Sequence, residues 1–470
     1  MYCGFITNLK NVRPHPNADR MQLADCFGNT VCVGLAAKEN DIVIYFPTDG
    51  QLSIEYCAHN DLVRRKDENG NPAGGYLDPE KRNVRAIRLR GEKSDGITMP
   101  LESLAYTGVD ISTLTVGAQI TIVNGHEICQ KYIPKTNEEH FHGSTGNKTR
   151  KKKVPTAPLF TEHADTEQLA YNLSTFHSGD EIEITLKMHG TSQRTGHLPV
   201  LQGYKRSLWD RIFRRDGTPQ YAYGYVSGTR RVVLDNYEGG FYGDNAFREA
   251  HSKAFEGKLM KGETVYYEVV GFTTSGQPIM GDASNKKLND KEFIKQYGET
   301  THFSYGCSPY TTEQQMITLK QAYGTAEEAC NHVDLLKPQS DIYVYRMTMT
   351  NEDGFVVEYT PDFMRYRCEQ MGMKCVPVLW RGTIPEHPGS AEDPTITAGE
   401  WIKNVAELYY DGPDPVGKTH VREGVVIRIL NRPKFAAYKH KNWSFKCLEG
   451  IVKADAEMPD MEEAQEVTNV

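Results

Sequence analysis

Short apolar runs broken by turn residues dominate the chain up to about residue 125. The runs are TVCVGLAA, DIVIYFP, VRAIRLRG, GITMPL and AQITIV. Runs of this length, separated by glycine, proline, asparagine and aspartate, are typical of short strands in a small antiparallel barrel or sandwich. We therefore predict a β-rich domain over residues 1–125.

The pattern changes after residue 156. Strand-like segments such as EIEITLK and ETVYYEVV alternate with helical segments such as TAEEACNHVDLLK and EDPTITAGEWIKNVAELYY. This mixture predicts an α+β domain over residues 156–450.

Two further segments carry charge without apolar periodicity. Residues 126–155 contain the basic run Arg150, Lys151, Lys152 and Lys153 and read as a linker, whose lysines are either solvated or in contact with phosphate. Residues 451–470 are rich in carboxylates and poor in large apolar groups, which predicts a disordered acidic tail.

Composition is typical of a soluble globular protein. The 470 residues are too many for one core, and 25% are charged and 39% hydrophobic. There is no apolar run of about 18 residues, and the start MYCGFITNLK has no apolar signal region, so we expect a cytoplasmic protein without membrane contact. The net charge of −8 argues against binding of nucleic acid through bulk charge alone, but it allows a basic cleft.

The ten cysteines are scattered along the chain without a CxxC pair. That spacing argues against a structural zinc site. We expect buried free thiols.

The strand EIEITLK is followed directly by MHGTSQR. Ile182, Ile184 and Leu186 share one face at period two, so Lys187 stands at the polar end of a half-buried strand. Such a lysine is often a solvated charge at a strand edge. It can also be a covalent nucleophile, provided that it is neutral when it attacks. The residues downstream must decide between the two.

Further polar and aromatic residues recur at the ends or in the middle of later strand-like segments. They are Arg230 and Arg231 in VSGTRR, Glu268 in ETVYYEVVGF, Tyr343 and Tyr345 in DIYVYRMTM, Glu423 before GVVIRI, and Lys439 and Lys441 in AAYKHKNWSFK. A carboxylate inside an apolar strand, such as Glu268, is costly unless it has a partner.

This order of motifs resembles the covalent nucleotidyltransferase superfamily of ATP-dependent RNA ligases, DNA ligases and mRNA capping enzymes. KMHGT (187–191) is similar to the K-x-H-G-T nucleophile motif of one RNA ligase branch, and KHKN (439–442) to its K-x-K-N motif. The opening NVRPHPNADRMQLADC resembles the OB-type tRNA-binding domains of some aminoacyl-tRNA synthetases. The resemblance implies an N-terminal OB-like β-barrel domain followed by an adenylyltransferase domain of antiparallel sheets with flanking helices.

The resemblance also implies roles for the motif residues. Lys187 would attack the α-phosphate of ATP, and Lys439 and Lys441 would neutralise that phosphate. Glu423 would organise Mg²⁺ or Mn²⁺, directly or through water. Glu268 would accept hydrogen bonds from the ribose hydroxyls. Tyr345 would stack on the adenine, with Tyr343 as the alternative, and Lys446 could replace one of the two motif lysines.

The remaining residues of the predicted site surround the nucleophile motif and the arginine pair. His189 either stabilises the turn or takes part in catalysis, and Gly190 lets the chain pass close to the nucleotide. Arg230 would hold a phosphate or the 5′-phosphate end of the acceptor strand, with Arg231 as the competing choice. Relatives carry asparagine or arginine where this chain has Ser192, so Arg194 could supply the contact to ribose or phosphate.

The function implied is an ATP-dependent RNA ligase that seals 5′-phosphate and 3′-hydroxyl ends through a lysyl-AMP intermediate. The sequence ends soon after Lys446, so we expect the extra domain to precede the core, as in the branch that seals nicks with an RNA 3′-hydroxyl strand. The expected partner is RNA or an RNA-containing nicked duplex, bound by a monomer. The alternatives are a DNA ligase, a tRNA-repair ligase, or a non-catalytic RNA-binding protein on a ligase fold.

Overall fold

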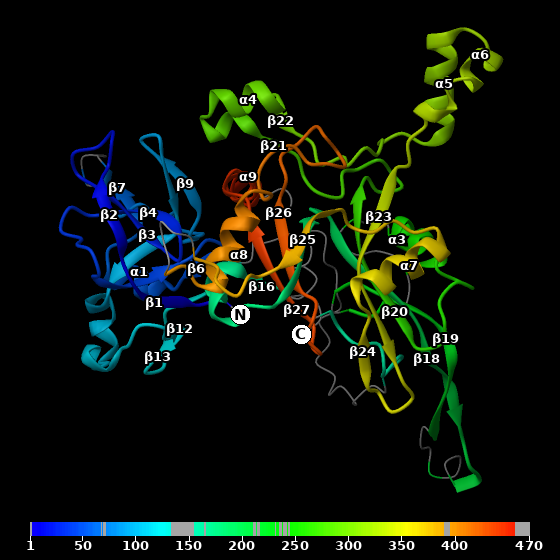
Figure 1. Ribbon diagram of the computed structural model, residues 1–470, viewed down its shortest axis with the longest axis horizontal. Helices are drawn as coiled ribbons and strands as arrows, with labels where there is room; N and C mark the ends of the chain where they lie inside the picture. The colour runs from blue at the N-terminus through cyan, green and yellow to red at the C-terminus, as the bar shows by residue number, and fades with distance from the viewer. Residues whose placement is uncertain are drawn as a thin grey trace. The chain divides into compact units, whose positions relative to one another are not determined.

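The computed structural model divides the chain into two compact units (Figure 1). Unit 1 consists of Met1–Lys135, Ala283–Glu299 and Asn442–Pro459. Unit 2 consists of Thr136–Asp282, Thr300–Lys441 and Asp460–Val470. The structure describes residues 2–66, 68, 72–132, 155–163, 166–209, 213, 217–230, 232–234, 237, 242, 245–389 and 395–455.

This division differs from the continuous ranges expected from the sequence. Two segments inside the range 156–450 belong to unit 1 by their contacts. The start of the expected linker forms two short strands, while the basic run 150–153 and the tail after Asp455 lie outside the described residues.

Unit 1 is built from short antiparallel strands. Its largest sheet has the order β11-β5-β1-β12, and β2, β3 and β4 form a second sheet. The described strands of this unit fall into several small sheets rather than one closed ring, so the OB-like barrel stays a prediction. The strands are β1 (Gly4–Asn8), β2 (Lys10–Pro14), β3 (Gln22–Cys26), β4 (Asn29–Val33), β5 (Ile42–Phe46), β6 (Gly50–Leu52), β7 (Arg64–Lys66), β8 (Pro72–Gly74), β9 (Ala86–Leu89), β10 (Glu92–Asp95), β11 (Ile97–Pro100), β12 (Gln119–Ile120), β13 (Ile122–Val123), β14 (His126–Glu127), β15 (Cys129–Lys131) and β21 (Ala283–Ser284).

Helices from distant parts of the sequence complete unit 1. They are α1 (Ile54–His59), α4 (Lys291–Tyr297) and α9 (Trp443–Asp455). The Nζ of Lys446 on α9 lies 2.6 Å from Oδ2 of the buried Asp95, and Arg88 stacks over the Trp443 ring at 5.0 Å. A buried carboxylate needs such a partner, so this ion pair anchors α9 to the strands of unit 1.

Two five-stranded sheets form the frame of unit 2 (Figure 1). One has the order β16-β27-β26-β17-β25 and the other β19-β18-β20-β23-β24. All pairs within them are antiparallel except β16 with β27. The strands are β16 (Glu167–Gln168), β17 (Glu181–Lys187), β18 (Thr191–Lys205), β19 (Thr218–Gly228), β20 (Glu263–Gly271), β22 (Thr300–Thr301), β23 (Ser340–Thr350), β24 (Val356–Glu358), β25 (Val378–Thr383), β26 (Gly424–Ile429) and β27 (Ala436–Lys441).

Most helices of unit 2 begin at a side-chain cap. Thr325 and Thr397 each form a capping box at the start of α6 and α8, and Thr360 caps α7, which carries a proline in its first turn. The helices are α3 (Ala246–Lys253), α5 (Thr312–Tyr323), α6 (Ala326–Cys330), α7 (Pro361–Met371) and α8 (Ala398–Glu407). The prediction of antiparallel sheets with flanking helices is confirmed for this unit.

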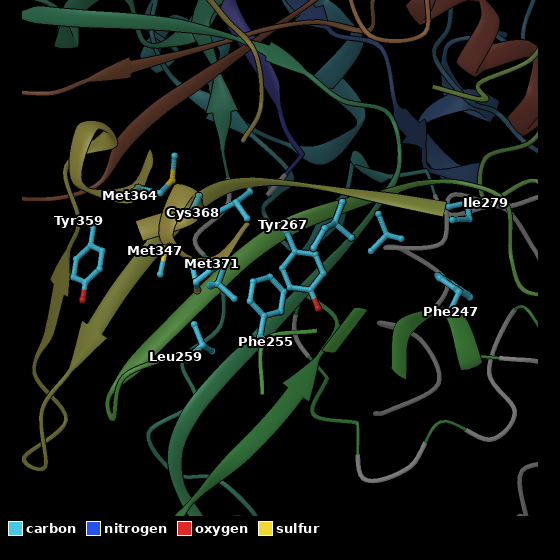
Figure 2. Close-up of a cluster of buried hydrophobic side chains, with 14 of the residues drawn as sticks. Phe247, Phe255, Leu259, Tyr267, Ile279, Met347, Tyr359, Met364, Cys368 and Met371 are labelled. Carbon is cyan, nitrogen blue, oxygen red and sulfur yellow. The ribbon is translucent and has the colours of Figure 1, made fainter. Parts of the chain in front are cut away.

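Each sheet of unit 2 has its own apolar core. Ile182 and Ile184 of β17 pack with Ile427 of β26 and with Ile402 of α8. Figure 2 shows the core of the other sheet, in which Tyr267 of β20 lies among side chains from α3, β23 and α7. The alternation of apolar residues along β17 and β26 therefore buries one face and leaves the strand ends to the polar motifs.

Two expectations from composition can be compared with the structure. All ten cysteines are free thiols, and most of them are buried, as predicted. In the described residues, no helix is both long enough and apolar enough to span a membrane.

Candidate active site

Three neighbouring strands bring two motif lysines into one row. Lys187 at the end of β17 pairs with Gly424 at the start of β26, and Gly424 pairs with Lys441 at the end of β27. Adjacent strands lie about 4.8 Å apart, so the two lysines flank the glycine on either side. Gly424 has a φ of 148°, and a Cβ at this position would lie 2.2 Å from the carbonyl oxygen of His440. Only glycine fits in the middle of the row.

Glu423 lies directly before this glycine, and its carboxylate contacts both lysines. Its side chain is 2% exposed, and Oε1 lies 2.8 Å from Nζ of Lys187 and 3.4 Å from Nζ of Lys441. Its Oε2 is buried without a hydrogen bond and lies 3.7 Å from Nδ1 of His189. A buried carboxylate is tolerated here because two lysine side chains lie against it. The structure thus brings together the predicted residues Lys187, His189, Glu423 and Lys441.

The turn after Lys187 is held from both sides. The backbone N–H of His189 donates a hydrogen bond to the hydroxyl of Tyr305 at 2.7 Å. On the other side, a Cβ on Gly190 would lie 2.4 Å from the carbonyl oxygen of Val269 on β20. Gly190 therefore allows the turn to lie against β20, which is a closer reason for the glycine than an approach to the nucleotide.

Sequence reasoning missed Tyr305. Its side chain is 3% exposed, and burial together with the carboxylate of Asp414 raises the pKa of its hydroxyl well above the ordinary value of 10.0. The hydroxyl therefore stays neutral and available as an acceptor. Tyr305 lies in an irregular segment between α4 and α5, where neither a motif nor a period could have indicated it.

The second sheet supplies the predicted groups for base and ribose. Glu268 on β20 pairs with Ser192 on β18 and with Tyr343 on β23. Tyr345 falls at an irregularity of β23, and its hydroxyl lies 2.9 Å from Oγ of Ser192. Tyr343 is buried at 7% exposure and donates to Asp341, whereas Tyr345 is only partly buried. The greater accessibility of Tyr345 favours it over Tyr343 as the stacking residue.

Arg194, for which we expect a contact to ribose or phosphate at a nucleic-acid end, is held by backbone carbonyls instead. Arg194 is 1% exposed, its Nε donates to the carbonyl of Thr229 at 3.0 Å, and its Nη1 donates to the carbonyls of Phe160 and Thr161. Its guanidinium also lies over the Phe160 ring at 4.2 Å. A guanidinium fixed by backbone carbonyls holds the fold of the segment around residue 160.

Ser192 and Gln193 have structural partners as well. Gln193 is fully buried, and its Nε2 donates to Oγ of Ser227 and to the carbonyl of Arg248. Ser192 positions the ring of Tyr345 through the contact of their hydroxyl groups. The segment Ser192–Gln193–Arg194 therefore fixes the base of β18 rather than presenting a row of ligand contacts.

Arg230 follows β19 in a cationic neighbourhood. Burial first, and then Arg346, Arg230 and Arg194, lower the pKa of His163 well below its ordinary value of 6.5. His163 accepts a hydrogen bond from Nη1 of Arg346 at 3.1 Å and lies edge-on to Tyr345 at 5.1 Å. Of these arginines, Arg346 is also paired with the carboxylate of Glu358. Arg231, the competing choice, lies outside the described residues.

The structure also distinguishes among the candidate lysines. Lys439 lies on β27 two residues before Lys441, so the two share a face of the strand. Lys446 lies on α9 in unit 1 and is paired with Asp95. That pairing does not support Lys446 as a replacement for a motif lysine.

The site fits a hydrated divalent ion rather than a cage made of protein ligands. Across the described ranges, no group of three or more His, Cys, Asp or Glu side chains is arranged to hold a metal ion. Magnesium usually keeps several waters and needs only one or two carboxylates. The buried Oε2 of Glu423, which has no hydrogen bond, is suited to such an ion or to one of its waters.

Similarity to solved structures bears on the interpretation of this geometry. No protein-family model and no curated protein sequence matches the chain. Solved structures of a Naegleria gruberi RNA ligase do match it. A mutant with AMP and Mn is 15% identical with a TM-score of 0.53, covering 94% of this chain and 97% of that chain. A mutant with ATP and Mn is also 15% identical with a TM-score of 0.53, covering 96% and 99%.

The chain shares the fold of these RNA ligases. The Naegleria ligase with PPi is also similar, at 15% identity and a TM-score of 0.52 over 93% of this chain and 96% of that chain. Because the match covers nearly the whole of both chains, the ligase fold extends over both units. The row of Lys187, Gly424 and Lys441 thus lies within an RNA ligase fold.

Proposed function

We propose that this protein is an ATP-dependent RNA ligase that joins 5′-phosphate and 3′-hydroxyl ends through a lysyl-AMP intermediate. The observation that carries the proposal is the contact of Lys187 with Glu423, which also contacts Lys441, at the ends of three adjacent strands. The ligase fold supports it. A solvated lysine at a strand edge would not need a buried carboxylate, a second lysine and an obligate glycine beside it.

In the first step, Nζ of Lys187 attacks the α-phosphorus of ATP. The new N–P bond forms, the bond from phosphorus to the pyrophosphate oxygen breaks, and the proton lost by the nitrogen passes to the released pyrophosphate or to water. Lys441, whose Nζ lies 3.4 Å from the same Glu423 oxygen that Lys187 contacts, would neutralise charge on the phosphate. A divalent ion at Glu423 would supply further positive charge at the phosphate.

The other predicted residues bind and orient the nucleotide. Tyr345, held by Ser192, stacks on the adenine, and Glu268 accepts hydrogen bonds from the ribose. Arg230 and Lys439 contact phosphate oxygens. His189 lies beside both Glu423 and the nucleophile, and its position is fixed by Tyr305.

In the later steps the AMP moves to the 5′-phosphate of one strand, and the 3′-hydroxyl of the other attacks that phosphate and releases AMP. We infer that unit 1 is an OB-like module that grips the nucleic acid by backbone contacts. Its short antiparallel sheets are the support for this assignment. The preferred substrate is a nick with an RNA strand on the 3′-hydroxyl side.

Incubation with α-labelled ATP and Mg²⁺ or Mn²⁺ tests the proposal. The wild-type protein should carry label through denaturing electrophoresis, and Lys187→Ala should carry none. Lys258→Ala is a matched control, because Lys258 lies in the same unit and its Nζ donates to the carbonyl of Met371 rather than to Glu423. Unlabelled wild-type protein, or labelled Lys187→Ala, would contradict the proposal and favour a non-catalytic RNA-binding protein.

A panel of nicked duplexes then defines the substrate. Each duplex carries RNA or DNA on either side of the nick, and a nicked tRNA is added to the panel. We expect the fastest sealing with RNA on the 3′-hydroxyl side. Equal sealing of all-DNA nicks would favour a DNA ligase, and sealing of only the tRNA would favour a tRNA-repair ligase.

A further inference from the structure

The strands β18 and β19 continue beyond the sheet that they belong to (Figure 1). β18 pairs with β20 only over Thr191 to Gly196, whereas it pairs with β19 as far as Lys205 opposite Thr218. We call residues 197–205 and 218–225 the ribbon. The described residues between its two strands, 206–209, 213 and 217, are called the tip. β18 itself begins at Thr191, directly after the turn that follows Lys187.

The base of the ribbon is braced rather than loose. The rings of His197 and Tyr225 stack at 4.6 Å, and Leu198 is fully buried. Further out, the N–H of Leu201 donates to the carbonyl of Thr156 at 2.8 Å, and the hydroxyl of Tyr221 donates to the carbonyl of Pro155 at 3.1 Å. The ribbon is thus tied to a second segment of the chain and can hold its tip in a defined direction.

The tip of the ribbon exposes large apolar side chains. Leu208, Trp209 and Phe213 are 76%, 68% and 60% exposed. The N–H of Phe213 donates to the carbonyl of Trp209, and the two rings stack with centroids 5.9 Å apart and planes at 14°. Large exposed aromatic groups that are already stacked on each other are typical of an interaction site.

The charge of the same segment is opposite to that of the chain. Residues 204–216, YKRSLWDRIFRRD, contain five basic and two acidic residues, whereas the whole chain has a net charge of −8. Stacked rings beside basic residues are the combination that binds single-stranded nucleic acid, because bases stack on the rings and phosphates meet the cations.

The length of β18 sets how far the tip can reach. β18 has 15 residues, which at about 3.3 Å per residue gives at most about 45–50 Å from the nucleophile turn to Lys205. That distance corresponds to roughly 14 stacked nucleotides at ~3.4 Å each. A strand that is joined at Lys187 could therefore also contact the tip.

We propose that the tip of the ribbon is a second RNA-binding site, which holds unpaired nucleotides of the substrate at a distance from the ends being joined. Trp209 and Phe213 stack on the bases, while Lys205 and Arg206 contact the phosphates. This proposal rests on the proposed ligase function and adds a preference for substrates with a single-stranded extension.

The test compares the wild-type protein with the double variant Trp209→Ala and Phe213→Ala. The probes are a nicked RNA duplex with flush ends and the same duplex with an unpaired oligouridine extension of about 20 nucleotides, longer than the reach of the ribbon, on either side of the nick. We expect the variant to bind the extended duplex about tenfold more weakly and the flush duplex unchanged. Lysyl-AMP formation should also be unchanged.

Phe355→Ala is the matched control. Phe355 is 72% exposed at another turn of unit 2, and its neighbours Glu352 and Asp353 are acidic. It should leave the affinity for both duplexes unchanged. Thermal unfolding of each variant should match the wild type, because the substituted side chains are exposed.

Several results would overturn the proposal. They are equal affinity of the variant and the wild type for the extended duplex, an equal loss on both duplexes, or a loss of binding to anionic vesicles with unchanged RNA affinity. The last result would assign the tip to a membrane surface. Failure of the ligase proposal is separate, since it would appear as absent lysyl-AMP in the wild type, whereas the RNA affinities are measured without ATP.

Discussion

The substitution Gly190→Ala tests whether the turn after the nucleophile must lie against β20. The new Cβ would lie 2.4 Å from the carbonyl oxygen of Val269, 2.8 Å from Cγ1 of Val270 and 2.9 Å from Cγ of Glu268. Ordinary contacts begin at 3.4 Å, so the turn or β20 must move by about 1 Å. Overpacking of this kind costs about 1–3 kcal/mol of stability.

The effect on catalysis should exceed the effect on stability. Gly190 lies three residues after Lys187, and a displacement of about 1 Å in a reacting group lowers rates by up to ~100-fold. We expect single-turnover formation of lysyl-AMP to fall by about 10- to 100-fold, with a thermal midpoint only a few degrees lower. Gly224→Ala is the control, because its Cβ would meet Val200 only at 3.6 Å.

The reasoning would be refuted if Gly190→Ala formed lysyl-AMP within about twofold of the wild-type rate, a difference of less than ~0.5 kcal/mol. It would also be refuted if Gly224→Ala lost as much activity as Gly190→Ala. In either case the close approach of the turn to β20 would not control the nucleophile.

Three further predictions concern a hydrogen bond, an ion pair and pH. Tyr305→Phe removes the acceptor of the His189 N–H and should slow single-turnover formation of lysyl-AMP by about tenfold. Tyr343→Phe should have little effect in the same assay. Similar rates for the two variants would contradict the positioning role of Tyr305. Arg367→Ala leaves the fully buried Glu263 without its 2.8 Å ion pair and should lower the free energy of unfolding by about 3–5 kcal/mol. Arg381→Ala, whose pair with Asp362 is exposed, should lower it by less than ~1 kcal/mol. Thermal unfolding measures both, and equal shifts would be inconsistent with the burial argument. Burial raises the pKa of Cys26 and Cys129 from 9.0 to about 12. Because these thiols lose their protons at lower pH in the unfolded chain, the stability of the fold should decrease as the pH rises from 9 towards 12. A thermal unfolding midpoint that stays constant over that range would count against this prediction.

Much of the site could be predicted because its residues stand at the ends of regular strands. The alternation in β17 and β26 fixes which face is buried, so Lys187 and Glu423 had to emerge at the same edge once the strands paired. The order of the motifs along the chain indicated the remaining residues of the predicted site. The contact of Lys187 with Glu423 agrees with both arguments.

The sequence could not predict contacts that depend on irregular segments. Tyr305 reaches the nucleophile turn across more than a hundred residues of sequence, and the conformation of its loop follows no period. Arg194 looks like a ligand in the sequence because arginine is usually exposed, yet three backbone carbonyls bury it. The segments Ala283–Glu299 and Asn442–Pro459 join unit 1 through tertiary contacts that no local pattern encodes.

The composition of unit 1 from three separate stretches limits how the protein can be dissected. The chain enters or leaves this unit between Lys135 and Thr136, on both sides of Ala283–Glu299, and directly after Lys441. A fragment lacking the first 135 residues would keep α9 but lose Asp95, the partner of Lys446. Unit 1 therefore cannot be removed by deleting residues 1–135 alone. Lys441, which we propose neutralises the phosphate, is one peptide bond from the unit 1 segment Asn442–Pro459.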